Sequence, residues 1–175
     1  DSQFAFKYAT TSGTIVEFMN TQKGKALVSK VSGYDEKMRK ANPDEINAMF
    51  LSNHDQVRIA NALESKGLDY EKFAASVYML FPGNSFTYYG EEIGARGSRG
   101  SNNTDANRRL AMLWGDGDTI ADPEGSTYPA TAQVKATVQD QLAQETSMLN
   151  HYSKLIGIRN RYPAIARGEY TAVSQ

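Results

Sequence analysis

The sequence predicts an α/β fold built around parallel strands. An apolar run over residues 46–52 ends abruptly in Asn53-His54-Asp55, as a buried strand does when it delivers polar groups at its carboxyl end. A helical pattern over residues 69–80 follows, and a second strand-like run occupies residues 85–89. Strand, helix and strand in this order are typical of a parallel sheet, whose ligands bind beyond the carboxyl ends of its strands.

Upstream of that unit, the sequence predicts a strand, a helix and a turn. Residues 2–8 alternate in the manner of a short strand, and residues 13–31 have the apolar spacing of a helix that is interrupted near Gly24. Asn42-Pro43-Asp44-Glu45 is typical of a turn and leads into the strand at 46–52. The alternating aromatic residues expected on one side of the first strand are Phe4, Phe6 and Tyr8.

Between the two later strands, the sequence predicts two helices. The first covers residues 56–66 and is closed by Gly67. The second has Asp69 as its predicted N-cap and ends at Leu80. The predicted apolar face of this second helix consists of Phe73, Val77 and Leu80.

The remainder of the chain combines a long loop with a long helical pattern. Residues 94–129 are rich in Gly, Asn, Asp and Ser, which is typical of an irregular loop with a functional role. Residues 131–161 carry the longest apolar stripe, which Pro163 is expected to end. The tail at 165–173 is expected to begin a further strand.

Composition excludes several classes of function. The 175 residues include 19 basic and 20 acidic side chains, so the net charge of -1 argues against a nucleic-acid or anionic-membrane partner. No apolar run approaches the roughly 20 residues of a membrane span. The absence of cysteine excludes disulfides and thiolate metal sites, and the two histidines, His54 and His151, lie on separate predicted elements. The sequence therefore predicts no metal site.

Asn53-His54-Asp55 places an amide, an imidazole and a carboxylate together. Such a group could bind adjacent sugar hydroxyls, orient a base or hold a metal. A structural alternative is that Asp55 caps a helix beginning near Gln56 while His54 packs beneath it. Arg58 follows one turn later and could contact the same ligand or form a surface ion pair.

Two further groups of charged residues need interpretation. Glu91 and Glu92 are adjacent, so their carboxylates point in different directions and do not suit the acid pair of a glycosidase. Asp105 and Arg109 lie four residues apart on the long loop. They could line a ligand site, form a salt bridge that orders the loop, or do both.

Three segments resemble the α-amylase family of glycoside hydrolases: residues 50–56, residues 88–94 and residues 105–114. The resemblance implies that Asp55 is the catalytic residue that holds the sugar hydroxyls and stabilises the distorted ring. It implies that His54 assists, and that Asp105 and Arg109 contact a neighbouring sugar. Asn53 and Arg58 complete the expected substrate-binding set. Ala111 and Leu113 depart from the family pattern, which normally has Pro and often Asp there.

The resemblance implies that residues 1–164 are the C-terminal part of a catalytic (β/α)8 TIM barrel, about strands 6 to 8, and that residues 165–175 begin a C-terminal β domain. A whole barrel usually needs about 250 residues. The family's nucleophilic Asp and general-acid Glu come from the earlier strands, so this segment alone is expected to be inactive. Its expected partner is the rest of its own catalytic domain.

The function implied by the resemblance is retaining hydrolysis of α-1,4-glucosidic bonds in starch or maltooligosaccharides. Alternatives are an α-1,6-glucosidase or transglycosylase of the same family, a non-catalytic glucan-binding relative, and an unrelated flavodoxin-like protein. No cofactor is expected in this segment, although calcium is possible in the full-length enzyme. Because polymeric starch cannot enter cells, an extracellular or cell-surface location is expected.

Overall fold

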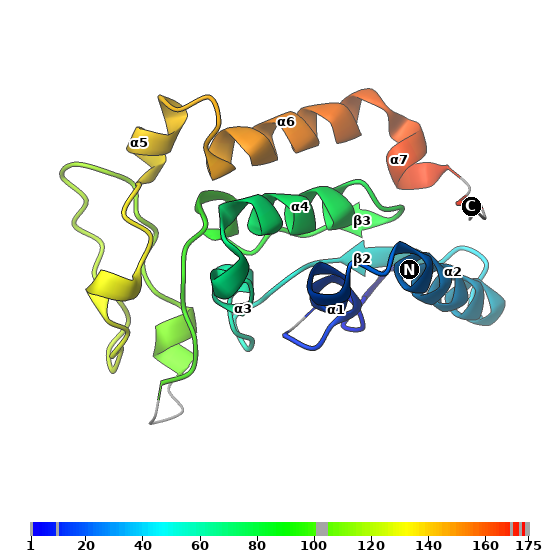
Figure 1. The fold of residues 1–175 in the computed structure, drawn as a ribbon, viewed down its shortest axis with the longest axis horizontal. Coiled ribbons are helices and arrows are strands. Elements are labelled where there is room, and N and C mark those ends of the chain that lie inside the picture. Colours follow the sequence, from blue (N-terminus) through cyan, green and yellow to red (C-terminus); the bar gives the residue numbers. More distant parts are fainter. Residues whose placement is uncertain (1, 10, 101–104, 169, 172, 174–175) are drawn as a thin grey trace.

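The computed structural model describes residues 2–9, 11–100, 105–168, 170–171 and 173. Within these residues, β1 (Ser2–Phe4), β2 (Ile46–Met49) and β3 (Asn84–Ser85) form a parallel sheet in the order β1-β2-β3. The backbone N–H of Ala5 donates to the carbonyl of Ala48 at 2.9 Å, and that of Phe86 donates to Met49 at 2.7 Å. The carboxyl ends of all three strands therefore lie at the same end of the sheet, as Figure 1 shows for β2 and β3.

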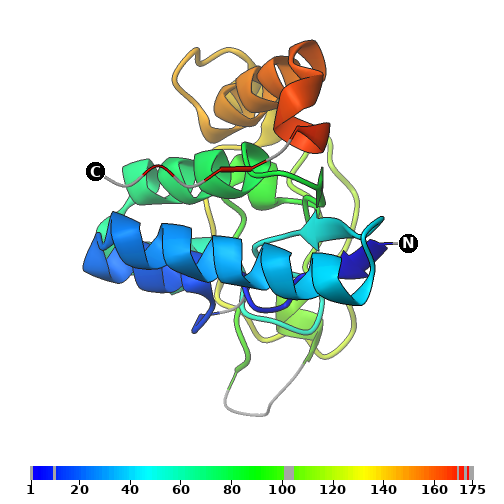
Figure 2. The same cartoon turned by 90° about the vertical axis from the view of Figure 1, so that its right-hand side faces the viewer.

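Helices connect and cover the strands. The helix α1 packs against both α2 and α4, and α4 packs in turn against α6, so the helices form successive layers (Figures 1 and 2). None of the described helices is long and apolar enough to cross a bilayer. The α-helices are α1 (Thr14–Thr21), α2 (Gly24–Ala41), α3 (Ile59–Ala62), α4 (Leu68–Met79), α5 (Val138–Leu142), α6 (Met148–Arg161) and α7 (Pro163–Arg167). Single 3-10 turns are η1 (Glu64–Lys66), η2 (Glu91–Ile93), η3 (Asp105–Arg108) and η4 (Ala130–Ala132).

The two faces of the sheet differ. On the helix side, one apolar core joins the sheet to the helices through residues that include Ile15, Met49, Leu51, Tyr78 and Tyr152. On the other side, phenylalanine rings pack edge to face, as Phe4 does against Phe50 and Phe86 with centroids 5.6 and 5.0 Å apart. Phe4, Phe6 and Phe86 nevertheless remain exposed. One face of the sheet is thus buried in a core, whereas the other face presents exposed aromatic side chains.

The predicted strands are shorter in the structure than in the sequence pattern. The strand predicted at 2–8 ends at Phe4, and Tyr8 is buried while Phe4 and Phe6 are exposed, so their alternation does not mark one face. The strands predicted at 46–52 and 85–89 pair only over Ile46–Met49 and Asn84–Ser85. Beyond those points the chain turns toward the loops that follow each strand, so the ladder hydrogen bonds stop.

The interruption predicted near Gly24 is confirmed, because α1 ends at Thr21 and α2 begins at Gly24. The predicted end near residue 31 is wrong, since α2 continues to Ala41. The predicted N-cap Asp69 is also wrong: Gly67 occupies that position with φ of 84°, and Asp69 lies in the first turn of α4. The buried side chains of α4 are Glu71, Ala74, Ala75, Tyr78 and Met79, whereas the predicted face residues Phe73 and Leu80 are exposed.

The long helical pattern at 131–161 is broken into α5 and α6. Thr137 and Asp140 form a reciprocal capping box that starts α5, and the hydroxyl of Ser147 accepts from the N–H of Asn150 to start α6. The helix end predicted before Pro163 is confirmed, because α6 ends at Arg161; Pro163 then begins α7, where its missing N–H costs nothing. The predicted tail strand is instead helical at 165–167, and residues 169 and 172 of that prediction lie outside the described part.

Candidate active site

The candidate site begins where β2 ends. Asn53, His54 and Asp55 form a turn, in which the side-chain oxygen of Asn53 accepts from the N–H of Asp55 at 2.9 Å. The carbonyl of Asn53 also accepts from the N–H of Gln56 at 3.2 Å. The alternative in which Asp55 caps a helix is wrong, because α3 begins at Ile59 with Arg58 as its N-cap. The side chains of His54 and Asp55 remain 60% and 62% exposed, respectively.

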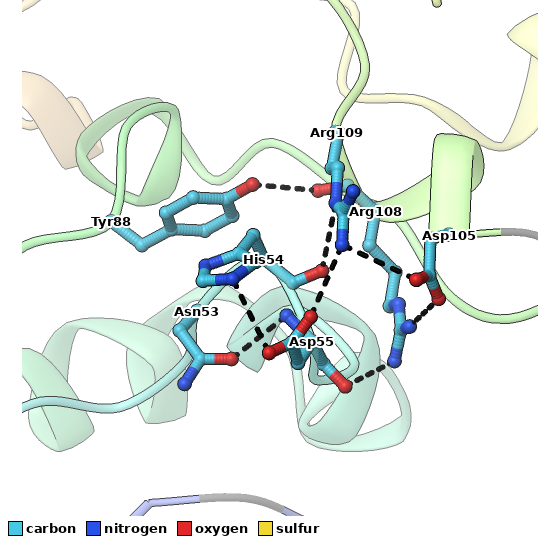
Figure 3. Close-up of polar contacts among 7 residues, drawn as sticks. All are labelled: Asn53, His54, Asp55, Tyr88, Asp105, Arg108 and Arg109. Atoms are coloured by element: carbon cyan, nitrogen blue, oxygen red, sulfur yellow. Dashed lines mark hydrogen bonds and ion pairs between the residues drawn. The ribbon is translucent and has the colours of Figure 1, made fainter.

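The Asp55 carboxylate has a different partner on each oxygen (Figure 3). Oδ2 lies 3.2 Å from Nε2 of His54, and Oδ1 accepts from Nη2 of Arg109 at 3.1 Å. The same guanidinium donates from Nε to the carbonyl of His54 at 3.3 Å. Asp55 is thus oriented by neighbours on two sides while most of its surface stays open to solvent.

The long loop delivers two consecutive arginines with different tasks. Arg109 is exposed and bridges Asp55 and Asp105, whose Oδ2 lies 3.2 Å from Nη2. Arg108 is buried and donates to the backbone carbonyl of Asp55 and to Oδ1 of Asp105. The hydrogen bond from Arg108 is the main cause that lowers the pKa of Asp105, and Arg109 adds to it. The salt bridge considered for Asp105 and Arg109 is therefore present and reaches Asp55 as well.

Arg58 lies inside the protein, with only 2% of its surface exposed. Its Nη1 donates to the carbonyl of Tyr89 at 2.6 Å, and its Nε donates to the carbonyl of Arg108 at 3.2 Å. Its guanidinium carbon also lies 4.5 and 4.8 Å from the ring centroids of Tyr88 and Tyr89. Arg58 therefore forms no surface ion pair with any described residue, and it is not exposed as a residue that binds a sugar would be. It instead connects the long loop, at Arg108, to the segment after β3, at Tyr89.

An open pocket of about 310 Å³ lies beside Asp55. Its lining includes four phenylalanine rings, the polar groups of the turn after β2, and Tyr88, whose hydroxyl donates to the carbonyl of Arg108 at 3.2 Å (Figure 3). Burial raises the pKa of Tyr88 to about 12, so its hydroxyl stays protonated at neutral pH. The pocket is lined by Phe4, Phe6, Phe50, Ser52, Asn53, His54, Asp55, Phe86, Thr87 and Tyr88.

Glu91 lies beneath this site and does not line the pocket. It is 2% exposed, and its carboxylate accepts from the hydroxyls of Tyr152 at 2.7 Å and Ser52 at 2.9 Å. Burial raises its pKa to about 7, although both hydroxyls act in the opposite direction. Glu91 therefore faces the core and not the pocket.

The described residues contain no group of three or more His, Asp or Glu side chains that could hold a metal ion. His151 lies far along the chain, with Nε2 2.9 Å from Oγ of Ser76 and 3.0 Å from the carbonyl of Lys72. Burial lowers its pKa.

The structure thus brings together two groups of predicted site residues that lie about fifty residues apart in the sequence. The first group is Asn53, His54 and Asp55 in the turn after β2, and the second is Asp105 and Arg109 on the long loop. Sequence reasoning gave no role to Arg108 or to Tyr88. The spacing of three between Asp105 and Arg108 could have indicated a contact within one helical turn. The backbone bond from Arg108 to Asp55 has no local signal, because it joins two segments that meet only in the folded protein.

A parallel sheet with helices on one face, and with a charged cluster and an open pocket beyond its strand ends, is the arrangement expected of part of a (β/α) barrel, in which ligands bind at that end of the strands. The protein-family model named alpha amylase, catalytic domain, matches residues 1–168 of the sequence. The chain therefore belongs to the α-amylase family, as the sequence motifs predicted.

Relatives of known structure or curated sequence agree. Alpha-amylase SusG of Bacteroides thetaiotaomicron is 36% identical over 169 residues, which are 97% of this chain and 23% of that protein. Eubacterium rectale Amy13B is 32% identical with a TM-score of 0.85, covering 98% of this chain and 34% of that one. The α-amylase from H. orenii is 30% identical with a TM-score of 0.77, covering 95% and 33%.

The chain thus spans between 23% and 34% of the length of these relatives. The predicted fold class is confirmed: the segment is a C-terminal portion of a (β/α)8 barrel. The domain boundary expected between residues 164 and 165 stays a prediction, and α7 runs across it.

Proposed function

We propose that this chain is the part of a retaining glycoside hydrolase that binds and distorts the sugar at the cleavage point, on α-1,4-linked glucans such as starch or maltooligosaccharides. The single observation that carries the proposal is the Asp55 carboxylate, which is oriented by His54 and Arg109 yet 62% exposed beside a pocket. A carboxylate held in this way can accept hydrogen bonds from two adjacent hydroxyls of one ring.

Each neighbouring residue has a distinct part in the proposed site. His54 shares Oδ2 of Asp55 and presents its ring to the same ligand, while Asn53 fixes the turn through its side-chain oxygen. Arg109 and Asp105 extend the polar surface away from Asp55 and provide donors and acceptors for a second sugar. Bonds to ring hydroxyls that strengthen as the ring flattens would lower the barrier of the oxocarbenium-like transition state.

A retaining mechanism also needs a nucleophile and an acid/base about 5 to 5.5 Å apart. Asp55 supplies neither role in this proposal, so both groups come from the rest of the catalytic domain. Support comes from the open aromatic face, where Phe4 and Phe6 are 51% and 56% exposed, and from β1 and β3, which have no outer neighbour among the described strands. We propose that further barrel strands cover that face. No step is assigned to a metal ion.

Among curated relatives, the proteins named α-amylase are 36% and 29% identical, whereas Probable oligo-1,6-glucosidase 2 of Bacillus subtilis is 24% identical. This order favours α-1,4 over α-1,6 cleavage. Product analysis with maltoheptaose and panose separates the two, and also separates hydrolysis from transglycosylation. Action on polymeric starch would require an extracellular or cell-surface location.

The proposal is tested by Asp55→Asn in the intact catalytic domain. Loss of the charge that faces the developing positive ring should lower kcat on maltoheptaose by about a hundredfold or more. The melting temperature should change little, because the side chain is exposed. Asp35→Asn on α2 is the matched control, since Asp35 also pairs with an arginine, Arg39, but lies outside the site. Near-normal turnover of Asp55→Asn would remove Asp55 from catalysis, and binding without hydrolysis by the unmodified protein would indicate a non-catalytic relative.

A further inference from the structure

We propose that Glu91 is a positioning residue that fixes the strand end carrying Asp55, and that it acts through the hydroxyl of Ser52. The proposal rests on the function proposed above. Glu91 belongs to η2, in the segment after β3, whereas Ser52 directly precedes the Asn53-His54-Asp55 turn. The link therefore runs from one barrel segment to the catalytic end of the neighbouring one.

The two hydrogen bonds of Glu91 reach different parts of the fold. Oε2 accepts from Oγ of Ser52 at 2.9 Å, and Oε1 accepts from the hydroxyl of Tyr152 at 2.7 Å. Tyr152 lies on α6 and is 1% exposed, so its position is set by the core, and Tyr78 on α4 faces the same carboxylate. One carboxylate thus joins the segment after β2 to α6, which packs against η2 and α4.

The cost of placing a carboxylate here indicates a function beyond packing. Glu91 is 2% exposed, and in the part of the chain that the structure describes it forms no ion pair with a basic side chain. A buried carboxylate that is compensated by hydroxyls alone is unfavourable relative to an apolar side chain of similar volume. Its two hydrogen bonds depend on direction, however, so they can restrict the position of the strand end more narrowly than apolar contacts can.

The turn that carries Asp55 is held from both ends. At its start, Ser52 is bonded to Glu91, and at its far end the carbonyl of Asp55 accepts from Arg108. Between these points the side chains of His54 and Asp55 are exposed, and Arg109 bonds both residues. The two anchors fix the backbone ends of the turn on which these side-chain contacts depend. A misplacement of about 1 Å can cost about a hundredfold in rate, so a loosened anchor should appear in turnover.

The test compares Glu91→Gln, Ser52→Ala and the double variant in the intact catalytic domain. Each single change should lower kcat on maltoheptaose by about tenfold with KM within about twofold, because the ligand groups stay but lose their alignment. The double variant should be no slower than the slower single variant, since both changes break one link. Unchanged kcat in the folded single variants, or losses that multiply, would overturn the proposal.

Glu71→Gln is the matched control. Glu71 is also a buried glutamate, but it lies on α4 and its partner is Arg96, with Nη2 3.7 Å from Oε1. This change should lower the melting temperature and leave kcat unaltered. A loss of kcat in Glu71→Gln equal to that in Glu91→Gln would show a general effect of weakened packing and would count against a positioning role. If Glu91→Gln does not fold, the proposal is tested by Ser52→Ala, which removes only one hydroxyl, and an unchanged kcat in that variant overturns it.

A second readout does not depend on activity. The amides of Asp55 and Gln56 donate to Asn53, so their hydrogen exchange reports the order of the turn. Exchange at these two amides should rise by about tenfold in Ser52→Ala, while amides inside α2 keep their rates. Equal rates in variant and unmodified protein would contradict the proposal. Absence of hydrolysis by the unmodified protein would instead contradict the proposed function, and the exchange result would still decide the role of Glu91.

Discussion

Arg109 lies 3.1 Å from Asp55, although 54 residues separate them in the chain. Both side chains are substantially exposed, so the ion pair contributes little to folding, on the order of 0–1 kcal/mol. Its effect is to orient the carboxylate and to place a cation beside the pocket. A stabilising contact and a functional contact thus differ here, and variants can separate them.

Arg109→Ala should change the melting temperature by no more than about 2 °C, because an exposed pair is removed. It should raise KM for maltooligosaccharides and lower kcat/KM by about tenfold or more, because the site loses a donor. Steady-state kinetics and thermal melts measure both effects. Arg39→Ala is the control, since Arg39 forms an exposed pair with Asp35 on α2 at 2.9 Å. Equal kinetics for the two variants would show that Arg109 does not contact substrate.

Arg58→Lys should destabilise the protein by about 2 to 4 kcal/mol, because a buried guanidinium that bonds two carbonyls is not replaced by an ammonium. It also loses the planar group that lies over the rings of Tyr88 and Tyr89. Denaturant unfolding of the intact domain measures the change. Arg39→Lys, at an exposed position, should stay within about 0.5 kcal/mol. A similarly small change in Arg58→Lys would contradict the structural role assigned to Arg58.

Gly90→Ala should be more destabilising than Gly94→Ala, although both glycines are in the left-handed region, with φ angles of 83° and 72°. Both changes impose the backbone cost of about 1 to 3 kcal/mol for an L side chain in that region. At Gly90 the added Cβ would also lie 2.9 Å from Cβ of Ala95 and 3.1 Å from Nη1 of Arg58, whereas at Gly94 its nearest neighbour would be Oε2 of Glu71 at 3.4 Å. The difference between their unfolding free energies measures the steric part, and equal values would show that the loop relaxes.

Stability should fall as pH rises from about 4.5 to about 7, in part through Glu91. Its pKa in the folded protein, about 7, lies above its ordinary value of 4.5, mainly because of burial. The folded state therefore binds the proton more tightly than the unfolded state does. The resulting stabilisation, about 3 kcal/mol, is complete below the unfolded pKa and is lost as pH rises through the folded one.

Glu91→Gln should flatten this dependence when unfolding is measured between pH 4.5 and pH 8. The groups that face Glu91 are Ser52 after β2, Tyr78 on α4, Tyr152 on α6 and the adjacent Glu92. Burial raises the pKa of Glu71 as well, so the comparison with the unmodified protein isolates the share of Glu91. An unaltered slope in Glu91→Gln would assign the dependence to other groups.

Much of the fold could be predicted because its signals are local. A stretch of only a few residues is enough to indicate the break near Gly24, the turn at 42–45 and the polar end of the central strand. Element ends were less predictable. Asp69 has the chemistry of an N-cap, yet Gly67 takes that position because the chain leaves η1 with a positive φ that glycine adopts freely.

The sequence by itself determined the parallel α/β class, the family and the segment that carries Asp55, because these depend on short patterns and on spacing along the chain. The tertiary structure alone decided that Arg58 is buried, that Arg108 reaches the backbone of Asp55, and that Glu91 meets Ser52 and Tyr152. Those contacts join segments 39 to 61 residues apart, and their partners are chosen by packing. No periodicity within one element contains that information.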